Sequence, residues 1–166
     1  MHRLFVRSAW SISKTWQRRC RRLDTAHLDV YLARINGSVQ TDPELAIGSA
    51  KELVEGTLKS ILLGLNEPFD EKGDDVTALL KKVQKRLDLA LDGVDAAKRG
   101  TDTIKRTLSN LGQLVVGVFE LRNLYGSGHG RTRRNAVDPR LARLTVGAAG
   151  TLCHFLLETY ELRVKD

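Results

Sequence analysis

The 166-residue sequence predicts an all-α protein, an antiparallel bundle of four to five helices. Three observations support this prediction. Apolar residues recur every three or four positions over long stretches, as they do along one face of a helix. The chain has only three prolines and few segments in which β-branched and polar residues alternate, which argues against an all-β fold. Because 42% of the residues are apolar, the chain can build a core, and wholesale disorder is excluded.

The first two helices are expected at Leu28–Ile35 and at the segment that ends near Gly64. The second helix starts at Thr41–Glu44, where a proline in the first turn and an acid near the positive helix end are typical start signals. Thr41 with a glutamate three residues later also fits a capping box. The N-cap is therefore either Thr41 or Asp42.

Three more helices are expected in the rest of the chain. An acidic loop at positions 70–75 precedes a helix over 76–87, whose apolar residues share one face. Another helix starts at Thr101 or Asp102 and runs to position 124. A second Asp-Pro pair opens the last helix at 138, and the apolar face of this helix is expected to include Leu144 and to extend to 160. Short connections favour antiparallel neighbours.

Positive charge is concentrated at the N-terminus. The chain has 27 Lys and Arg against 20 Asp and Glu, and seven of the basic residues precede the first acid, Asp24. From Asp24 onward there are 27 − 7 = 20 basic and 20 acidic residues, so the body is neutral. We expect residues 1–26 to be a basic arm and residues 27–166 to be one domain. The arm, which holds Trp10 and Trp16, fits a poorly ordered leader, an RNA- or partner-binding segment, or a mitochondrial transit peptide.

Several protein classes are excluded by composition. Two cysteines, Cys20 and Cys153, are too few for a disulfide framework or a Cys-rich zinc site, and they fit a reducing compartment such as the cytoplasm. Four scattered histidines have no metal-ligand spacing, so we expect neither a metal nor another cofactor. The longest apolar run is far below the roughly 20 residues that cross a bilayer, so no membrane partner is expected.

One group of residues in the sequence is a candidate catalytic site. The apolar stripe of the helix that starts near position 101 continues onto a charged residue, Arg122, and a buried guanidinium needs a partner. Asn123 follows directly, and His129 follows seven residues later within a glycine-rich run. Arg122 and His129 can face one site whether the helix continues for about 10 Å or unwinds at the glycines. In the alternative interpretation, Arg122 caps helix carbonyls or pairs with Glu52 or Glu55.

The same region is strongly basic. Between positions 122 and 143 six arginines accompany a single acid, Asp138, a local charge of 6 − 1 = +5 within a neutral body. Arginine is suited to bidentate contact with phosphate, and a histidine among such residues can act as a general acid or base near neutral pH. The arginines are Arg122, Arg131, Arg133, Arg134, Arg140 and Arg143.

The segment that contains Arg122, Asn123 and His129 resembles the R-N-x(4–6)-H motif of the HEPN superfamily, with six residues between the arginine and the histidine. The stretch Asp42–Glu55, the Gly-His-Gly around His129 and a last helix ending near Leu156 are similar to the abortive-infection C-terminal (Abi_C) branch. The resemblance covers residues 28–163. It implies a HEPN-like bundle that forms a homodimer, with the two motifs facing each other across the interface.

The resemblance also implies a metal-independent endoribonuclease in phage defence (abortive infection) or a toxin. Arg122 would hold the scissile phosphate of RNA, His129 would be the acid or base for attack by the 2′-hydroxyl, and Asn123 would orient either group. An antitoxin or another defence protein is a further expected partner. The alternative is a non-catalytic RNA- or protein-binding dimerisation module, as some family members are. RNA contacts are expected at Tyr125, Gly128, Gly130, Arg131, Arg133 and Arg134.

Overall fold

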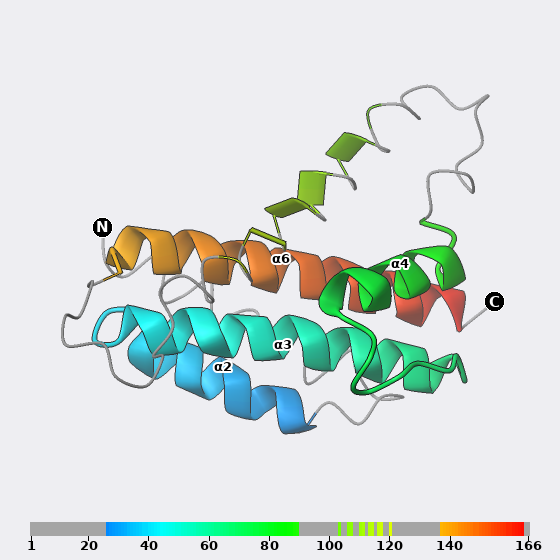
Figure 1. Cartoon of the computed structure of the whole chain (residues 1–166), viewed down its shortest axis with the longest axis horizontal. Coiled ribbons are helices and arrows are strands. Elements are labelled where there is room, and N and C mark those ends of the chain that lie inside the picture. Colours follow the sequence, from blue (N-terminus) through cyan, green and yellow to red (C-terminus); the bar gives the residue numbers. More distant parts are fainter. Residues whose placement is uncertain are drawn as a thin grey trace.

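The computed structural model describes residues 26–89, ten residues between 103 and 120, and residues 137–164. In this part of the chain all regular structure is helical, which confirms the predicted all-α fold (Figure 1). Its helices are α2 (Ala26–Ser38), α3 (Pro43–Gly64), α4 (Val76–Arg86) and α6 (Pro139–Arg163). We call the ten helical residues between α4 and α6 the 103–120 segment: Thr103, Arg106, Thr107, Asn110, Leu111, Gln113, Leu114, Val116, Gly117 and Glu120.

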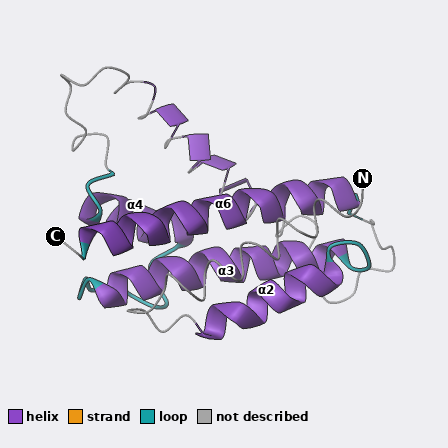
Figure 2. Ribbon diagram, turned by 180° about the vertical axis from the view of Figure 1, so that it is seen from behind, coloured by secondary structure: helices purple, strands orange, loops and turns teal. Residues whose placement is uncertain are grey.

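Helix α3 lies at the centre of the described bundle and packs against α2, α4 and α6 (Figure 2). Helices α2 and α3 are antiparallel, as the short connection between them requires. Helices α3 and α6 run in the same direction, because Ala46 near the start of α3 packs with Ala142 near the start of α6. The antiparallel arrangement therefore holds for α2 and α3, which a short turn joins. Helix α6 departs from it, and so does α4, which ends beside the C-terminal end of α6, where Asp88 pairs with Arg163 (Figure 1).

The start of α3 is capped by Asp42. Its carboxylate accepts a hydrogen bond from the backbone N–H of Leu45 at 3.1 Å, and Pro43 occupies the first turn. The hydroxyl of Thr41 instead donates to the carbonyl of Gly37 at 3.0 Å. Of the two caps that the sequence allows, the structure selects Asp42. Helix α2 also extends beyond its expected bounds on both sides and includes Gly37.

The core consists of the face of α3 that meets α6 and the residues of α2 and α4 that cover it. Leu53 and Leu58 on α3 are completely or almost completely buried. Opposite them on α6, the buried thiol of Cys153 lies 3.9 Å from the carbonyl oxygen of Leu53, which also accepts a hydrogen bond from Thr57 at 2.8 Å. Cys153 is fully buried in the core, and this burial raises the pKa of its thiol to about 12.

The acidic loop between α3 and α4 is held by its own carboxylates. Asp70 accepts a hydrogen bond from the backbone N–H of Lys72 at 2.9 Å, and Asp74 accepts one from the backbone N–H of Asp70 at 2.9 Å. Asp75 caps α4 through the N–H of Ala78 at 2.8 Å. These bonds fix the shape of the loop, and its residues Phe69 and Glu71 form one wall of a groove beside the C-terminal half of α3.

Two further sequence predictions concern the N-terminal arm and membrane spans. Residues 1–25 lie outside the described part of the chain, so the division into a basic arm (1–26) and a domain (27–166) stays a prediction. None of the described helices combines the length and the apolar character that crossing a bilayer requires.

Candidate functional site

The nine predicted site residues fall in one stretch that the structure does not describe, positions 121–136. Their predicted roles therefore remain predictions, and the structure contributes the framework on either side of the stretch. The nine are the catalytic candidates Arg122, Asn123 and His129 and the RNA-binding candidates Tyr125, Gly128, Gly130, Arg131, Arg133 and Arg134.

The chain leaves this stretch at a fixed point. Val137 is buried and packs with Ala46 and Ile47 of α3 and with Ala142 of α6. Asp138 then caps α6 by accepting a hydrogen bond from the backbone N–H of Arg140 at 2.8 Å. The C-terminal end of the candidate stretch is thereby anchored where the first turns of α3 and α6 meet.

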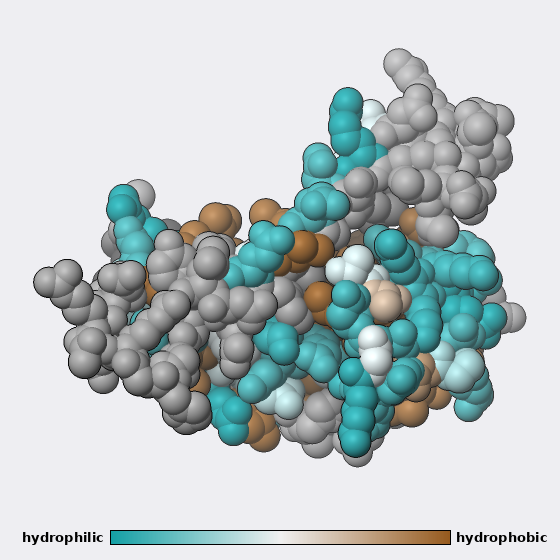
Figure 3. Space-filling view, in the orientation of Figure 1, coloured by the Kyte–Doolittle hydropathy of each residue, from teal (hydrophilic) through white to brown (hydrophobic). Residues whose placement is uncertain are grey.

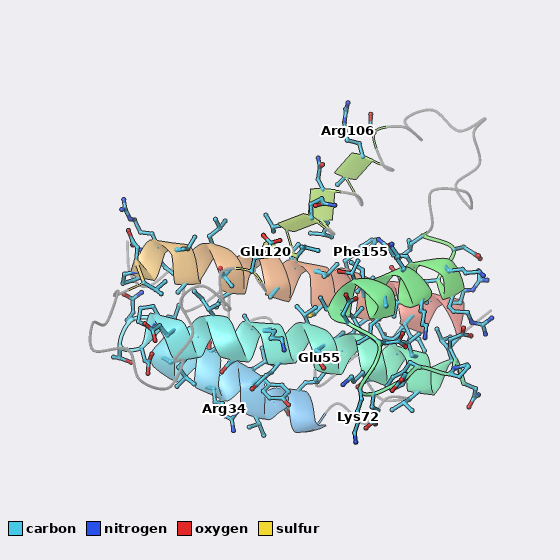
Figure 4. All side chains as sticks on the ribbon, viewed as in Figure 1. Arg34, Glu55, Lys72, Arg106, Glu120 and Phe155 are labelled. Carbon is cyan, nitrogen blue, oxygen red and sulfur yellow. The ribbon has the colours of Figure 1, made fainter. Side chains whose placement is uncertain are left out.

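The chain enters the stretch from the 103–120 segment, which crosses α6. Leu111 packs against the core, and Leu111 and Leu114 form one wall of a groove of about 490 Å³. Figure 4 places Glu120 beside α6, and Figure 1 shows the segment descending onto the N-terminal half of that helix. Both flanks of the candidate stretch therefore lie near this half of α6. We call the groove the α6 groove; its other wall is Arg143, Leu144, Gly147, Ala148 and Thr151.

The α6 groove is an apolar surface with a positive edge. Leu144 lies on the stripe that the sequence predicts to be buried, yet 61% of it is exposed, and Leu114 is 40% exposed. Figure 3 shows apolar surface along α6 next to the 103–120 segment. Sequence periodicity alone could not find this surface, because it assigns Leu144 to the core along with its neighbours on the stripe.

Two of the six arginines in the basic region are described, and they differ in their surroundings. Arg140 donates from Nε and Nη2 to Oδ2 of Asp138 at 2.9 and 2.6 Å. The hydrogen bonds and charge of Arg140 lower the pKa of Asp138 to about 2, and Asp138 in turn raises the pKa of Arg140. Arg143 lines the α6 groove and has no ion pair within the described residues. The charge of Arg143 is thus less compensated than that of Arg140.

The carboxylates suggested as alternative partners of Arg122 already have basic neighbours. Glu52 lies 3.3 Å from Arg34 of α2. Glu55 lies 2.9 Å from Lys59 and 3.4 Å from Lys51. Partial burial opposes ionisation of Glu55, but these two lysines outweigh it and lower the pKa of Glu55. If Arg122 pairs with Glu52 or Glu55, that carboxylate must therefore bind a second or third basic residue.

Acids and histidines in the described part of the chain do not gather into a cluster of three or more that could hold a metal ion. The described histidine with a carboxylate nearby is His154, whose Nε2 lies 3.5 Å from Oε1 of Glu158 one helical turn later on α6. This pair lies on a single helix, and we assign it no chemistry.

Comparison with known proteins bears on the chain as a whole. The family model described as Abi_C, a HEPN-like domain, matches residues 25–160. The match begins one residue before α2 and ends three residues before the last residue of α6. It includes the candidate stretch and both of its flanks. No curated protein and no solved structure matches the chain.

Proposed function

Because the chain belongs to the Abi_C family of HEPN-like domains, we propose that it is a metal-independent endoribonuclease of the abortive-infection kind, acting in phage defence or as a toxin. The observation that carries the proposal is the order Arg122, Asn123 and His129, at the HEPN spacing, within the matched residues 25–160. Fold alone does not establish an activity, so the proposal depends on these three side chains.

The proposed reaction is attack of a ribose 2′-oxygen on the adjacent phosphorus. His129 removes the proton of the 2′-hydroxyl, the bond between phosphorus and the 5′-oxygen breaks, and the products are a 2′,3′-cyclic phosphate and a 5′-hydroxyl. Arg122 neutralises the phosphate oxygens, and Asn123 orients the phosphate or the histidine. The leaving 5′-oxygen needs a proton, and one histidine cannot serve both steps at once. We therefore assign the second proton-transfer group to a second copy of the chain.

The surroundings of the candidate stretch support a homodimer. Both of its flanks lie near the N-terminal half of α6, where the α6 groove presents Leu144 and Leu114 to solvent. Exposed apolar surface of this kind is common at protein interfaces. A second copy packed on the α6 groove would lie beside the Arg122–His129 stretches, which is the arrangement that two proton-transfer groups require. Arg143 at the edge of the groove adds a cation for the RNA backbone.

The test is cleavage of RNA by the purified protein in the presence of EDTA. We expect a 2′,3′-cyclic phosphate product, and no cleavage of a substrate with a 2′-deoxyribose at the scissile position. His129→Ala and Arg122→Ala should each lower the rate by about 10²-fold or more. Arg106→Ala is the matched control for charge, because Arg106 is an exposed arginine of the 103–120 segment outside the motif (Figure 4).

Two results would contradict the proposal. Cleavage that survives both substitutions, or that requires an added metal, would assign the activity to other groups. Binding of RNA that weakens steeply with salt but yields no product would instead identify the non-catalytic binding module.

A further inference from the structure

A second groove lies on the opposite part of the bundle from the α6 groove. It has a volume of about 370 Å³ and is lined by residues of α2, of α3 and of the loop that follows. Its charged residues are three glutamates and one lysine, and Lys59 pairs with Glu55. The lining residues used below are Tyr31, Glu52, Glu55, Lys59, Leu63, Phe69 and Glu71. Figure 4 shows Glu55 of α3 with Arg34 of α2 and Lys72 of the same loop around this region. We call it the acidic groove.

The acidic groove combines apolar surface with carboxylates. Tyr31 and Phe69 are half-buried, while Leu63 is 66% exposed although it is a large apolar residue on a well-formed helix. Glu71 has no ion pair within the described part of the chain. A ligand that fits this groove should bring an apolar or aromatic group for Leu63 and positive charge for Glu71.

The charge of the surrounding chain selects the class of ligand. Residues 26–75, which form α2, α3 and the loop, have ten acidic and four basic residues, a net charge of 4 − 10 = −6. A surface of this sign repels RNA phosphates and attracts a basic peptide. The N-terminal residues 1–23 of the same chain carry seven basic residues and no acidic one. The two oppositely charged segments are adjacent in sequence.

The same arm also supplies the aromatic group and has the required reach. Trp16 is followed closely by Arg18 and Arg19. Trp16 precedes the start of α2 by ten residues, which span at most about 35 Å when extended. Tyr31 lies only five residues inside α2, or about 7.5 Å along its axis. The attachment point of the arm is therefore close to the groove, and a short tether gives a high effective concentration.

We propose that the N-terminal arm binds the acidic groove of its own chain, with Trp16 as the apolar anchor on Leu63 and Arg18 and Arg19 facing Glu71. Binding removes the ring of Trp16 from water and brings the basic residues of the arm next to the acidic groove. This contact is independent of whether the domain cleaves RNA. In this proposal the seven basic residues of the arm interact with an acidic surface of the protein and not with RNA.

The arm contains the only two tryptophans of the chain, Trp10 and Trp16, so the tryptophan fluorescence of the full-length protein reports on the arm alone. In a Trp10→Phe background, the remaining signal comes from Trp16. We expect its emission to be shifted to the blue relative to a free arm peptide, and its quenching by acrylamide to be several-fold weaker. Raising the salt from 0.15 M to 1 M, which shortens the Debye length from about 8 to about 3 Å, should increase quenching.

Two groove variants test the location, each with a matched control. Leu63→Gln and Glu71→Lys should increase acrylamide quenching of Trp16 several-fold toward the value of the peptide. Leu162→Gln changes a leucine of nearly equal exposure, 65%, at the end of α6, and Glu120→Lys changes an exposed glutamate of the 103–120 segment. Both controls should leave the quenching unchanged, and circular dichroism should show that all four variants remain folded.

Three outcomes would overturn the proposal. Quenching of Trp16 in the unchanged protein that equals that of the peptide would show that the arm is not bound. Quenching that is unaffected by both groove variants would place the arm elsewhere on the domain. Quenching that increases on dilution would show that the groove takes the arm of a second copy.

Discussion

The charges of Arg140 and Asp138 compensate each other at the first turn of α6. Nε and Nη2 of the guanidinium donate to Oδ2 at 2.9 and 2.6 Å, while the backbone N–H of Arg140 donates to Oδ1 at 2.8 Å. Arg143, one turn later, has no ion pair among the described residues and lines the α6 groove. These two arginines are three positions apart, yet the charge of Arg143 is the less compensated of the two.

The first prediction follows from this difference. Arg143→Gln should weaken binding of RNA and should reduce the slope of log Kobs against log salt by about 1, the contribution expected of one phosphate contact. Arg140→Gln should have a smaller effect on the slope, because the guanidinium of Arg140 already pairs with Asp138 and releases fewer counterions on meeting a phosphate. Both slopes can be measured by fluorescence anisotropy with a labelled RNA. Equal slopes for the two variants would contradict the assignment.

The second prediction concerns acid stability. The pKa of Asp138 is lowered from 3.8 to about 2, first of all by the side-chain hydrogen bonds from Arg140. A group with a depressed pKa in the folded state stabilises the fold above its unfolded pKa, and this contribution is lost as the pH falls through the folded value. Asp138→Asn keeps a side chain that caps helices well but removes the charge.

The stability difference between the unchanged protein and Asp138→Asn should therefore be largest above about pH 4 and should shrink between about pH 4 and pH 2. Urea unfolding at a series of pH values measures it, and the other carboxylates cancel because they are common to both proteins. A difference that stays constant over this range would show that the ion pair does not persist in solution.

The start signals of the helices were readable from the sequence, while the directions of the helices were not. Asp42-Pro43 and Asp138-Pro139 mark the starts of α3 and α6, because an aspartate cap and a proline in the first turn act locally. The parallel arrangement of α3 and α6 depends on the path of the long connection between them, which no local rule specifies. The choice of Asp42 over Thr41 likewise depended on the carbonyl of Gly37, which gives Thr41 another partner.

For the candidate site, the sequence predicted the residue types but not their surroundings. Counting charges over 122–143 treats all six arginines alike, whereas the geometry at the α6 cap separates Arg140 from Arg143. Periodicity also treats Leu144 as core, although the α6 groove leaves it 61% exposed. Both differences arise from tertiary neighbours. The roles of Arg122, Asn123 and His129 rest on motif and family, and the cleavage experiment tests them directly.

The third prediction tests the proposed homodimer. Leu144→Gln should convert dimers to monomers at micromolar protein concentration, because an amide in an apolar interface must be desolvated without a partner. Leu162→Gln is the control, since Leu162 is exposed to a similar extent, 65%, but lies at the far end of α6. Analytical ultracentrifugation gives the mass of each variant. A dimer that persists in Leu144→Gln would place the interface on another face.

The fourth prediction compares two leucines of α3 that are five positions apart. Leu58 is fully buried in the core cluster, whereas Leu63 is 66% exposed. Leu58→Ala removes core contacts and leaves a cavity, so it should lower the free energy of unfolding by about 2–5 kcal/mol. For the described helices alone, Leu63→Ala should change that free energy by no more than about 0.5 kcal/mol, because surface positions contribute little packing and alanine is at least as good a helix former. Any additional loss measures the contact of Leu63 with the arm proposed above. Urea unfolding followed by circular dichroism measures both values. A loss for Leu63→Ala as large as that for Leu58→Ala would contradict the exposure of Leu63 in the structure. A smaller loss accompanied by stronger quenching of Trp16 in the Trp10→Phe background would be the contribution of the arm.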